Sequence, residues 1–124
     1  METLVNCNII TEIESIDNVS GGNQEYEVYF TSSDKEKYKL VFDYVWEFRC
    51  AIENAYIDRA SKFNHAEIQK SSVLLVQNSQ YIKYFGKQVS GTRPLDAIRD
   101  YIIFDSIDTI IEVLTVKEPM IIKI

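Results

Sequence analysis

The chain has 124 residues, of which 46% are hydrophobic and 26% charged, and its formal net charge is −6. This composition is typical of a folded protein with one hydrophobic core, so we expect a single domain over residues 1–124 and exclude a disordered chain. Every apolar run is shorter than the roughly 18 residues that a membrane-spanning helix needs, so none is predicted.

The charge is distributed unevenly along the chain. Residues 1–34 contain seven acidic residues and no lysine or arginine, whereas residues 35–124 contain twelve acids and thirteen bases. The negative excess therefore lies in the first third. A field of this sign repels phosphate backbones, which disfavours nucleic acid as a partner, and it attracts a basic protein.

The cysteines and the N-terminus predict a cytoplasmic protein. Cys7 and Cys50 are the only cysteines and form no CxxC motif. The opening residues METLVNCNII lack the basic region of a secretory signal. We therefore expect a reducing compartment, two small buried thiols and no disulfide.

Three antiparallel strands are predicted first, over residues 4–14, 25–31 and 37–42. The stretch IDNVSGGNQ predicts a turn between the first two, with Gly21 and Gly22 free to adopt positive φ. Apolar residues at every second position define one covered face. The inward side chains are Val5, Cys7, Ile9, Thr11, Ile13, Tyr26, Val28, Phe30, Tyr38, Leu40 and Phe42.

A long helix is predicted next, because the apolar period changes to three or four residues between Asp43, a suitable cap, and Phe63. Trp46 lies off the apolar stripe. It either covers a sheet edge or is an exposed aromatic anchor for a partner. The stripe consists of Val45, Phe48, Ile52, Ala55, Tyr56, Ala60 and Phe63.

The second half predicts short elements. Buried strands are expected at 72–76 and 101–104, separated by a short helix that is capped by Asn78 or Ser79 and ends near Gly86. A hairpin turning at Asn78-Ser79 is the alternative to that helix. The spacing of Ile107, Ile110, Ile111 and Leu114 predicts another helix, which Asp105, Ser106 or Asp108 can cap and Pro119 breaks. The residues MIIKI predict a last strand.

These elements predict an α+β fold. An antiparallel three-stranded N-terminal meander continues into a mixed sheet, and one long and two short helices pack mainly on one face.

No catalytic residue, cofactor or metal site is predicted. His65 is the only histidine, and its pairing with Cys50 lacks an oxyanion hole. Acid pairs such as Asp105 and Asp108 suit the first turn of a helix without further role. The sequence thus favours a protein that is not an enzyme. An unfamiliar enzyme using Glu47, Glu53 or His65 as acid or base is the weakest hypothesis.

An acidic ladder is the feature that predicts a partner. Glu12 and Glu14 are expected to share the outward face of the meander with Glu25 and Glu27, while Lys39 opposes Glu27 from the third strand. Like charges across a ladder destabilise a sheet, so folding does not require them. The alternative is a solvated face that neighbouring residues neutralise. The predicted partner-binding residues are Glu12, Glu14, Asp17, Glu25, Glu27 and Trp46.

The stretches VLLVQNSQYIKYF and RDYIIFDSIDTIIEVLTVKEPMI, within residues 72–122, resemble a pattern in small cytoplasmic proteins of Gram-positive bacteria. Some of those look like immunity proteins of the polymorphic-toxin type. The matching residues are structural: Asn78, Ser79, Tyr81, Ile82 and Phe85.

The resemblance implies an immunity protein. Such a protein neutralises a cognate toxin by stoichiometric binding, here with an acidic surface toward a basic toxin site such as that of a nuclease. The alternative is a small-ligand or protein-binding regulatory module unrelated to toxins. We expect a monomer, or a homodimer formed through an exposed edge at the first strand.

Overall fold

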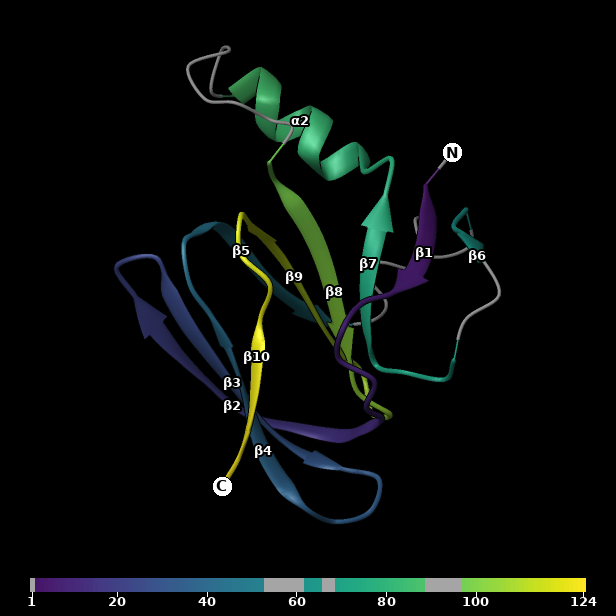
Figure 1. Ribbon diagram of the computed structural model, residues 1–124, viewed down its shortest axis with the longest axis vertical. Helices are drawn as coiled ribbons and strands as arrows, with labels where there is room; N and C mark the ends of the chain where they lie inside the picture. Colours follow the sequence, from purple (N-terminus) through teal and green to yellow (C-terminus); the bar gives the residue numbers. More distant parts are fainter. Residues whose placement is uncertain (1, 53–61, 66–68, 89–96) are drawn as a thin grey trace.

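The computed structural model describes residues 2–52, 62–65, 69–88 and 97–124 (Figure 1). These ranges contain ten strands in two sheets and one helix. Sheet A has the strand order β5-β9-β8-β7-β1-β6, and sheet B has the order β10-β4-β3-β2. All pairings are antiparallel except the short parallel pair β1–β6.

The bounds of the elements are as follows. Sheet A contains β1 Thr3–Asn6, β5 Val45–Ile52, β6 Asn64–His65, β7 Val73–Gln77, β8 Arg99–Phe104 and β9 Thr109–Thr115. Sheet B contains β2 Ile13–Gly22, β3 Glu25–Ser32, β4 Lys37–Phe42 and β10 Met120–Lys123. The helix is α2, Gln80–Gln88.

The predicted α+β fold with three helices is wrong. The described residues are mostly strand and include one helix. The segment predicted as a long helix begins with β5, and the segment predicted as the last helix contains β9. Residues 53–61 of the first segment lie outside the described ranges.

A β-bulge explains the error in β5. Val45 pairs with Thr115, but Glu47 pairs with Leu114, so Trp46 is an extra residue in the strand. The bulge returns Val45 and Phe48 to the same face, where both contact the core between the sheets. Their spacing of three residues therefore imitates a helical stripe.

Burial on both faces explains the error in β9. This strand lies between β5 and β8, and Ile110, Ile111, Val113 and Leu114 are all buried. A strand covered on both sides loses the alternation that distinguishes strand from helix. The remaining member of the predicted stripe, Ile107, is 66% exposed and precedes the strand.

The first predicted strand is two strands in different sheets. β1 pairs with β6 and β7 in sheet A, whereas β2 pairs with β3 in sheet B. The chain crosses between the sheets over residues 7–12 with no glycine or proline to mark the break. β2 then extends to Gly22, so the predicted turn shrinks to Asn23 and Gln24, which have φ values of 54° and 68°.

Other strand predictions are confirmed. β3 and β4 match the predicted second and third strands, with Val28, Phe30, Leu40 and Phe42 fully or almost fully buried. β7, β8 and β10 match the remaining predicted strands closely.

The main core lies between the two sheets. Val28, Phe30, Leu40 and Phe42 of sheet B contact Val73, Tyr101, Ile103, Ile111 and Val113 of sheet A. Aromatic contacts cross the same interface: Tyr26 stacks on Phe48 with ring centroids 4.4 Å apart, and Phe42 meets Tyr101 edge-on at 6.3 Å. Smaller clusters cover other parts of sheet A, including one under α2.

The predicted short helix is confirmed as α2, and the hairpin alternative is wrong. In Figure 1 the helix lies above the ends of β7 and β8. Ser79 is its cap, because its Oγ accepts a hydrogen bond from Ile82 N at 3.0 Å. The buried side chain of Glu2 contacts the same end of the helix, where its Oε2 accepts a hydrogen bond from Gln80 N at 2.9 Å.

No helix in the described ranges is long and apolar enough to cross a membrane. Cys7 and Cys50 are both free thiols. Cys7 is half-buried, and this burial raises the pKa of its thiol. Cys50 is exposed on β5, so the expectation that both thiols are buried is wrong for Cys50.

Candidate partner-binding surface

The two sheets are tied together where the chain crosses from β1 to β2. Ser72 N donates to Thr11 O at 2.6 Å, and Thr11 N donates to Ser71 Oγ at 3.1 Å. Ile13 N donates to Ser72 Oγ at 2.8 Å. These bonds satisfy the backbone of the crossing segment and hold it against the start of β7.

A cleft of about 410 Å³ opens at this point, and we call it the junction cleft. A second hollow of about 360 Å³ adjoins it and shares Glu12, Ser33 and Lys70. The junction cleft is lined by Glu12, Ile13, Glu14, Ser33, Lys70, Ser71, Ser72, Phe104, Asp105 and Ser106.

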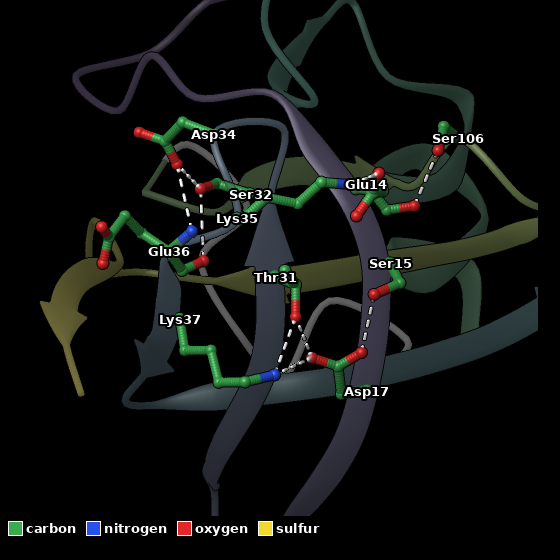
Figure 2. A network of polar contacts seen from close by, with 10 residues as sticks. All are labelled: Glu14, Ser15, Asp17, Thr31, Ser32, Asp34, Lys35, Glu36, Lys37 and Ser106. Atoms are coloured by element: carbon green, nitrogen blue, oxygen red, sulfur yellow. Dashed lines mark hydrogen bonds and ion pairs between the residues drawn. The ribbon is translucent and has the colours of Figure 1, made fainter.

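Two of the predicted partner-binding residues line this cleft, and each forms an ion pair with a lysine. Glu12 Oε2 lies 3.5 Å from Lys70 Nζ. Glu14 forms an ion pair with Lys35 (Figure 2). The side chains of Lys70 and Lys35 are 86% and 70% exposed, so water screens both pairs.

Asp17 is held by hydroxyl groups further along β2. Thr31 Oγ1 and Ser15 Oγ each donate to its carboxylate at 2.7 Å, as Figure 2 shows. Lys37 Nζ lies 3.9 Å from the same carboxylate. The hydrogen bonds from Thr31 and then Ser15 lower the pKa of Asp17 below its ordinary value.

The turn between β3 and β4 completes the network in Figure 2. Ser32 Oγ donates to Asp34, and Glu36 N donates to Asp34 Oδ1 at 3.2 Å. These two bonds lower the pKa of Asp34, and the bond from Ser32 has the larger effect. The turn thus places acids and lysines alternately beside the junction cleft.

The predicted ladder of four glutamates does not form. Ser20 pairs with Glu27 and Gly22 with Glu25, whereas Glu14 lies at the other end of β2 and Glu12 precedes the strand. The crossing between sheets, which the sequence analysis did not foresee, shifts the first strand and separates the glutamates. Glu25 and Glu27 therefore lie away from the junction cleft.

The predicted direct opposition of Glu27 and Lys39 is wrong, because Glu27 pairs with Val41 and Lys39 with Tyr29, but the two side chains form an ion pair diagonally across the strands. Lys39 Nζ donates to Glu27 Oε2 at 2.6 Å from the neighbouring strand, and this bond lowers the pKa of Glu27. Glu27, Glu14, Glu12 and Asp17 each have a lysine within 4.0 Å. Neighbouring lysines thus offset much of the negative excess that the sequence predicts for this surface.

Asp105 is a cleft residue that the sequence analysis interpreted as a helix cap. Its Oδ2 accepts from Ile16 N at 3.0 Å, and its Oδ1 accepts from Ile107, Asp108 and Thr109 N at 2.9–3.1 Å. One carboxylate therefore shapes the β8–β9 turn and ties it to β2. Of the three residues predicted as caps of a helix here, Asp105, Ser106 and Asp108, Asp105 accepts these backbone bonds, and the element is a turn before β9 rather than a helix.

Trp46 lies on another part of the molecule. It is half-buried on β5, and its ring lies 5.7 Å from that of Phe85 on α2. Of the two predicted roles of Trp46, the covering of a sheet edge agrees with its contact with Phe85, because β5 is an edge strand of sheet A.

A buried polar cluster, which was not predicted from the sequence, lies beneath α2. Asp100 and Glu112 are fully buried on adjacent strands, and Ser79 Oγ donates to Asp100 Oδ2 at 2.5 Å. Arg49, directly opposite Glu112, stacks over the ring of Tyr81 at 3.7 Å. The hydrogen bond from Ser79 to Asp100 and the contact of Arg49 with Tyr81 both tie α2 to sheet A.

The residues of the enzyme hypothesis are not assembled in the described ranges. Glu47 Oε1 lies 3.5 Å from Arg49 Nε. Glu53 lies outside the described residues, and for His65 the structure describes only the backbone pairing with Leu4. Among the described residues, no group of three or more histidines, cysteines or acids is placed to hold a metal ion.

No family model matches the chain, and no curated protein or solved structure is similar enough to count as a match.

Proposed function

We propose that the chain is a non-catalytic binding protein, and specifically an immunity protein that neutralises a cognate bacterial toxin by forming a stoichiometric complex. The observation that carries the proposal is the position of Glu12 and Glu14 in one cleft at the junction of the two sheets. The partner is a basic protein, and the junction cleft receives its lysine or arginine side chains.

The ion pairs of the cleft suit exchange with a partner. Lys35 and Lys70 are long, exposed side chains, and pairs of this kind contribute about 0–1 kcal/mol. A guanidinium group delivered by a partner forms two parallel bonds to a carboxylate and excludes water from the cleft. An ion pair of Glu12 or Glu14 with a docked arginine is therefore stronger than the exposed pairs with Lys70 and Lys35.

Two further observations support the proposal. Residues 72–122 resemble proteins of the immunity type. The residues that carry this resemblance form the helix cap and the buried strands of the fold. The net charge of −6 accelerates association with a basic partner, because complementary fields steer the encounter. We place the protein in the cytoplasm, where an exposed thiol such as Cys50 stays reduced.

The alternative is a regulatory module that binds a small ligand. The apolar side chains of Ile13 and Phe104 beside the cleft acids favour it, because ligand sites combine apolar walls with a few polar groups. Such a module would show no protection against a toxin.

The test is protection of cells from a toxin. The toxin is the variable C-terminal domain of a large secreted protein encoded beside this chain, expressed with the chain or without it. We expect growth to be restored by the chain, and a complex of one copy of each protein to be isolated by affinity purification.

Matched charge reversals locate the surface. The double variant Glu12→Lys with Glu14→Lys is expected to lose protection. The double variant Glu25→Lys with Glu118→Lys changes the net charge equally at exposed positions outside the cleft, and it is expected to protect. Failure of the wild-type chain to bind or protect refutes the immunity function, and equal protection by both variants refutes the cleft.

A further inference from the structure

The last strand of sheet B has one edge without a neighbouring strand among the described residues. β10 pairs with β4 and ends the strand order of its sheet, as the yellow strand in Figure 1 shows. Ile124 N donates to Lys37 O at 3.0 Å, so residues 120, 122 and 124 direct their backbone groups toward β4. By alternation, Ile121 and Lys123 direct N–H and C=O outward.

The side chains of this strand are apolar and exposed. Met120, Ile122 and Ile124 are 49%, 40% and 65% exposed, and the register places them on the outer face of sheet B beside Val41, Lys39 and Lys37. Exposed edge strands normally carry charges that prevent pairing with another chain, and β10 carries one lysine. Its edge is therefore suited to strand addition.

We propose that β10 pairs antiparallel with β10 of a second copy of this chain, with the two-fold axis at Ile122. In this register Ile121 lies opposite Lys123 of the second copy, and the outward N–H and C=O groups of both residues are satisfied. Met120 lies opposite Ile124 of the second copy. The three apolar side chains of each copy then form one continuous patch across the axis.

The neighbouring registers are excluded by the sequence of the strand. A shift that centres the pair on Ile121 places Pro119, which has no N–H, opposite Lys123. A shift that centres the pair on Lys123 places two lysines directly opposite each other, which is destabilising. Only the register centred on Ile122 uses every outward donor and opposes no like charges.

The charge distribution of sheet B permits this contact. The acids Glu14 and Asp17 lie on β2, at the opposite edge from β10, and β4 between them carries Lys37 and Lys39. Two copies of net charge −6 still repel each other as a whole. Added salt screens this repulsion and is expected to increase the dimer fraction. The inference is independent of the proposed function, because the junction cleft lies at the other edge of the sheet.

The first test is the molar mass by sedimentation velocity over the micromolar range. The wild type is expected to convert from monomer to dimer as concentration rises. Ile121→Pro removes an outward N–H and leaves the bonds to β4 intact, so it is expected to be a folded monomer. Ile122→Lys is expected to be monomeric too, whereas Ile107→Lys, the same change at an exposed turn residue, is expected to dimerise like the wild type.

The second test is the register, measured by disulfide cross-linking in a Cys7→Ala, Cys50→Ser background. Opposed residues in a pair of this kind have Cα atoms about 4.5 Å apart, within the range of a disulfide, so Ile122→Cys is expected to cross-link. Met120→Cys lies roughly 14 Å from its counterpart and is expected not to. A wild type that stays monomeric, or equal cross-linking of both variants, overturns the proposal.

Discussion

Ser79 Oγ, at the start of α2, donates a hydrogen bond of 2.5 Å to the fully buried carboxylate of Asp100 on β8. The same oxygen accepts from Ile82 N and so caps the helix. One hydroxyl group therefore serves two purposes: it caps the start of the helix and donates to a buried carboxyl group of sheet A. This contact joins the start of α2 to the centre of sheet A.

Ser79→Ala is expected to lower the free energy of unfolding by about 2–4 kcal/mol, because it removes a helix cap and one donor to a buried carboxylate. Urea denaturation measures the change. The exposed Ser20→Ala is the control and is expected to change stability by less than about 0.5 kcal/mol. Equal effects of the two substitutions would show that the contact with Asp100 contributes nothing.

The two glycines at the end of β2 are expected to respond differently to alanine. Gly21 has a φ of 156°, and an added Cβ would lie 2.4 Å from Glu25 O. Gly21→Ala is therefore expected to cost about 1–3 kcal/mol. An added Cβ at Gly22 meets no atom within 4 Å, so Gly22→Ala is expected to be nearly neutral. Thermal melts of both variants measure the difference, and a neutral Gly21→Ala would contradict this hairpin geometry.

The fold was predictable where a strand has one buried face and one solvent-exposed face. β3 and β4 alternate buried and exposed residues and were placed correctly, as was α2 with its cap at Ser79. The prediction failed where a strand does not alternate buried and exposed residues. In β5 a bulge at Trp46 interrupts the alternation, and in β9 both faces are buried. Local patterns carry no record of which strand pairs with which, so these segments fitted a helix equally well.

The candidate surface was predictable only in part. The excess of acids in the first third indicated the region, and Glu12 and Glu14 do line one cleft. Lys70, which forms an ion pair with Glu12, is far away in the sequence, in the irregular segment just before β7, and the crossing between the sheets brings the two residues together. The buried pair of Asp100 and Glu112 was missed because isolated acids within apolar strands have no distinctive spacing.

Asp17 is expected to titrate below 3.8, the ordinary value for an aspartate, because Thr31 and Ser15 donate to its carboxylate. Thr31→Val removes the larger contribution and is expected to raise the pKa of Asp17 toward 3.8, whereas Thr31→Ser retains the hydroxyl and the low value. Carbon-detected NMR titration of the side chain measures both. An unchanged pKa in Thr31→Val would refute the assigned cause.

The same shift predicts how stability depends on pH. Because the pKa of Asp17 is lower in the folded state, the unfolded chain binds a proton first as the pH falls. Asp17 therefore stabilises the fold at pH values above its pKa in the unfolded state, and this stabilisation is lost as the pH falls through its pKa in the folded state. Asp34 and Glu27 have lowered pKa values and act in the same direction. The difference in unfolding free energy between wild type and Thr31→Val is expected to be largest near neutral pH and to shrink in acid.

The most direct test of the proposed binding function is the dissociation constant of the proposed complex with a cognate toxin domain, measured by calorimetry at increasing salt. We expect the affinity of the wild type to fall with salt, and the Glu12→Lys, Glu14→Lys variant to bind at least about tenfold more weakly, a loss of about 1.4 kcal/mol. The Glu25→Lys, Glu118→Lys variant is expected to bind closer to the wild type. Equal weakening by both variants, or an affinity independent of salt, would contradict recognition through the junction cleft.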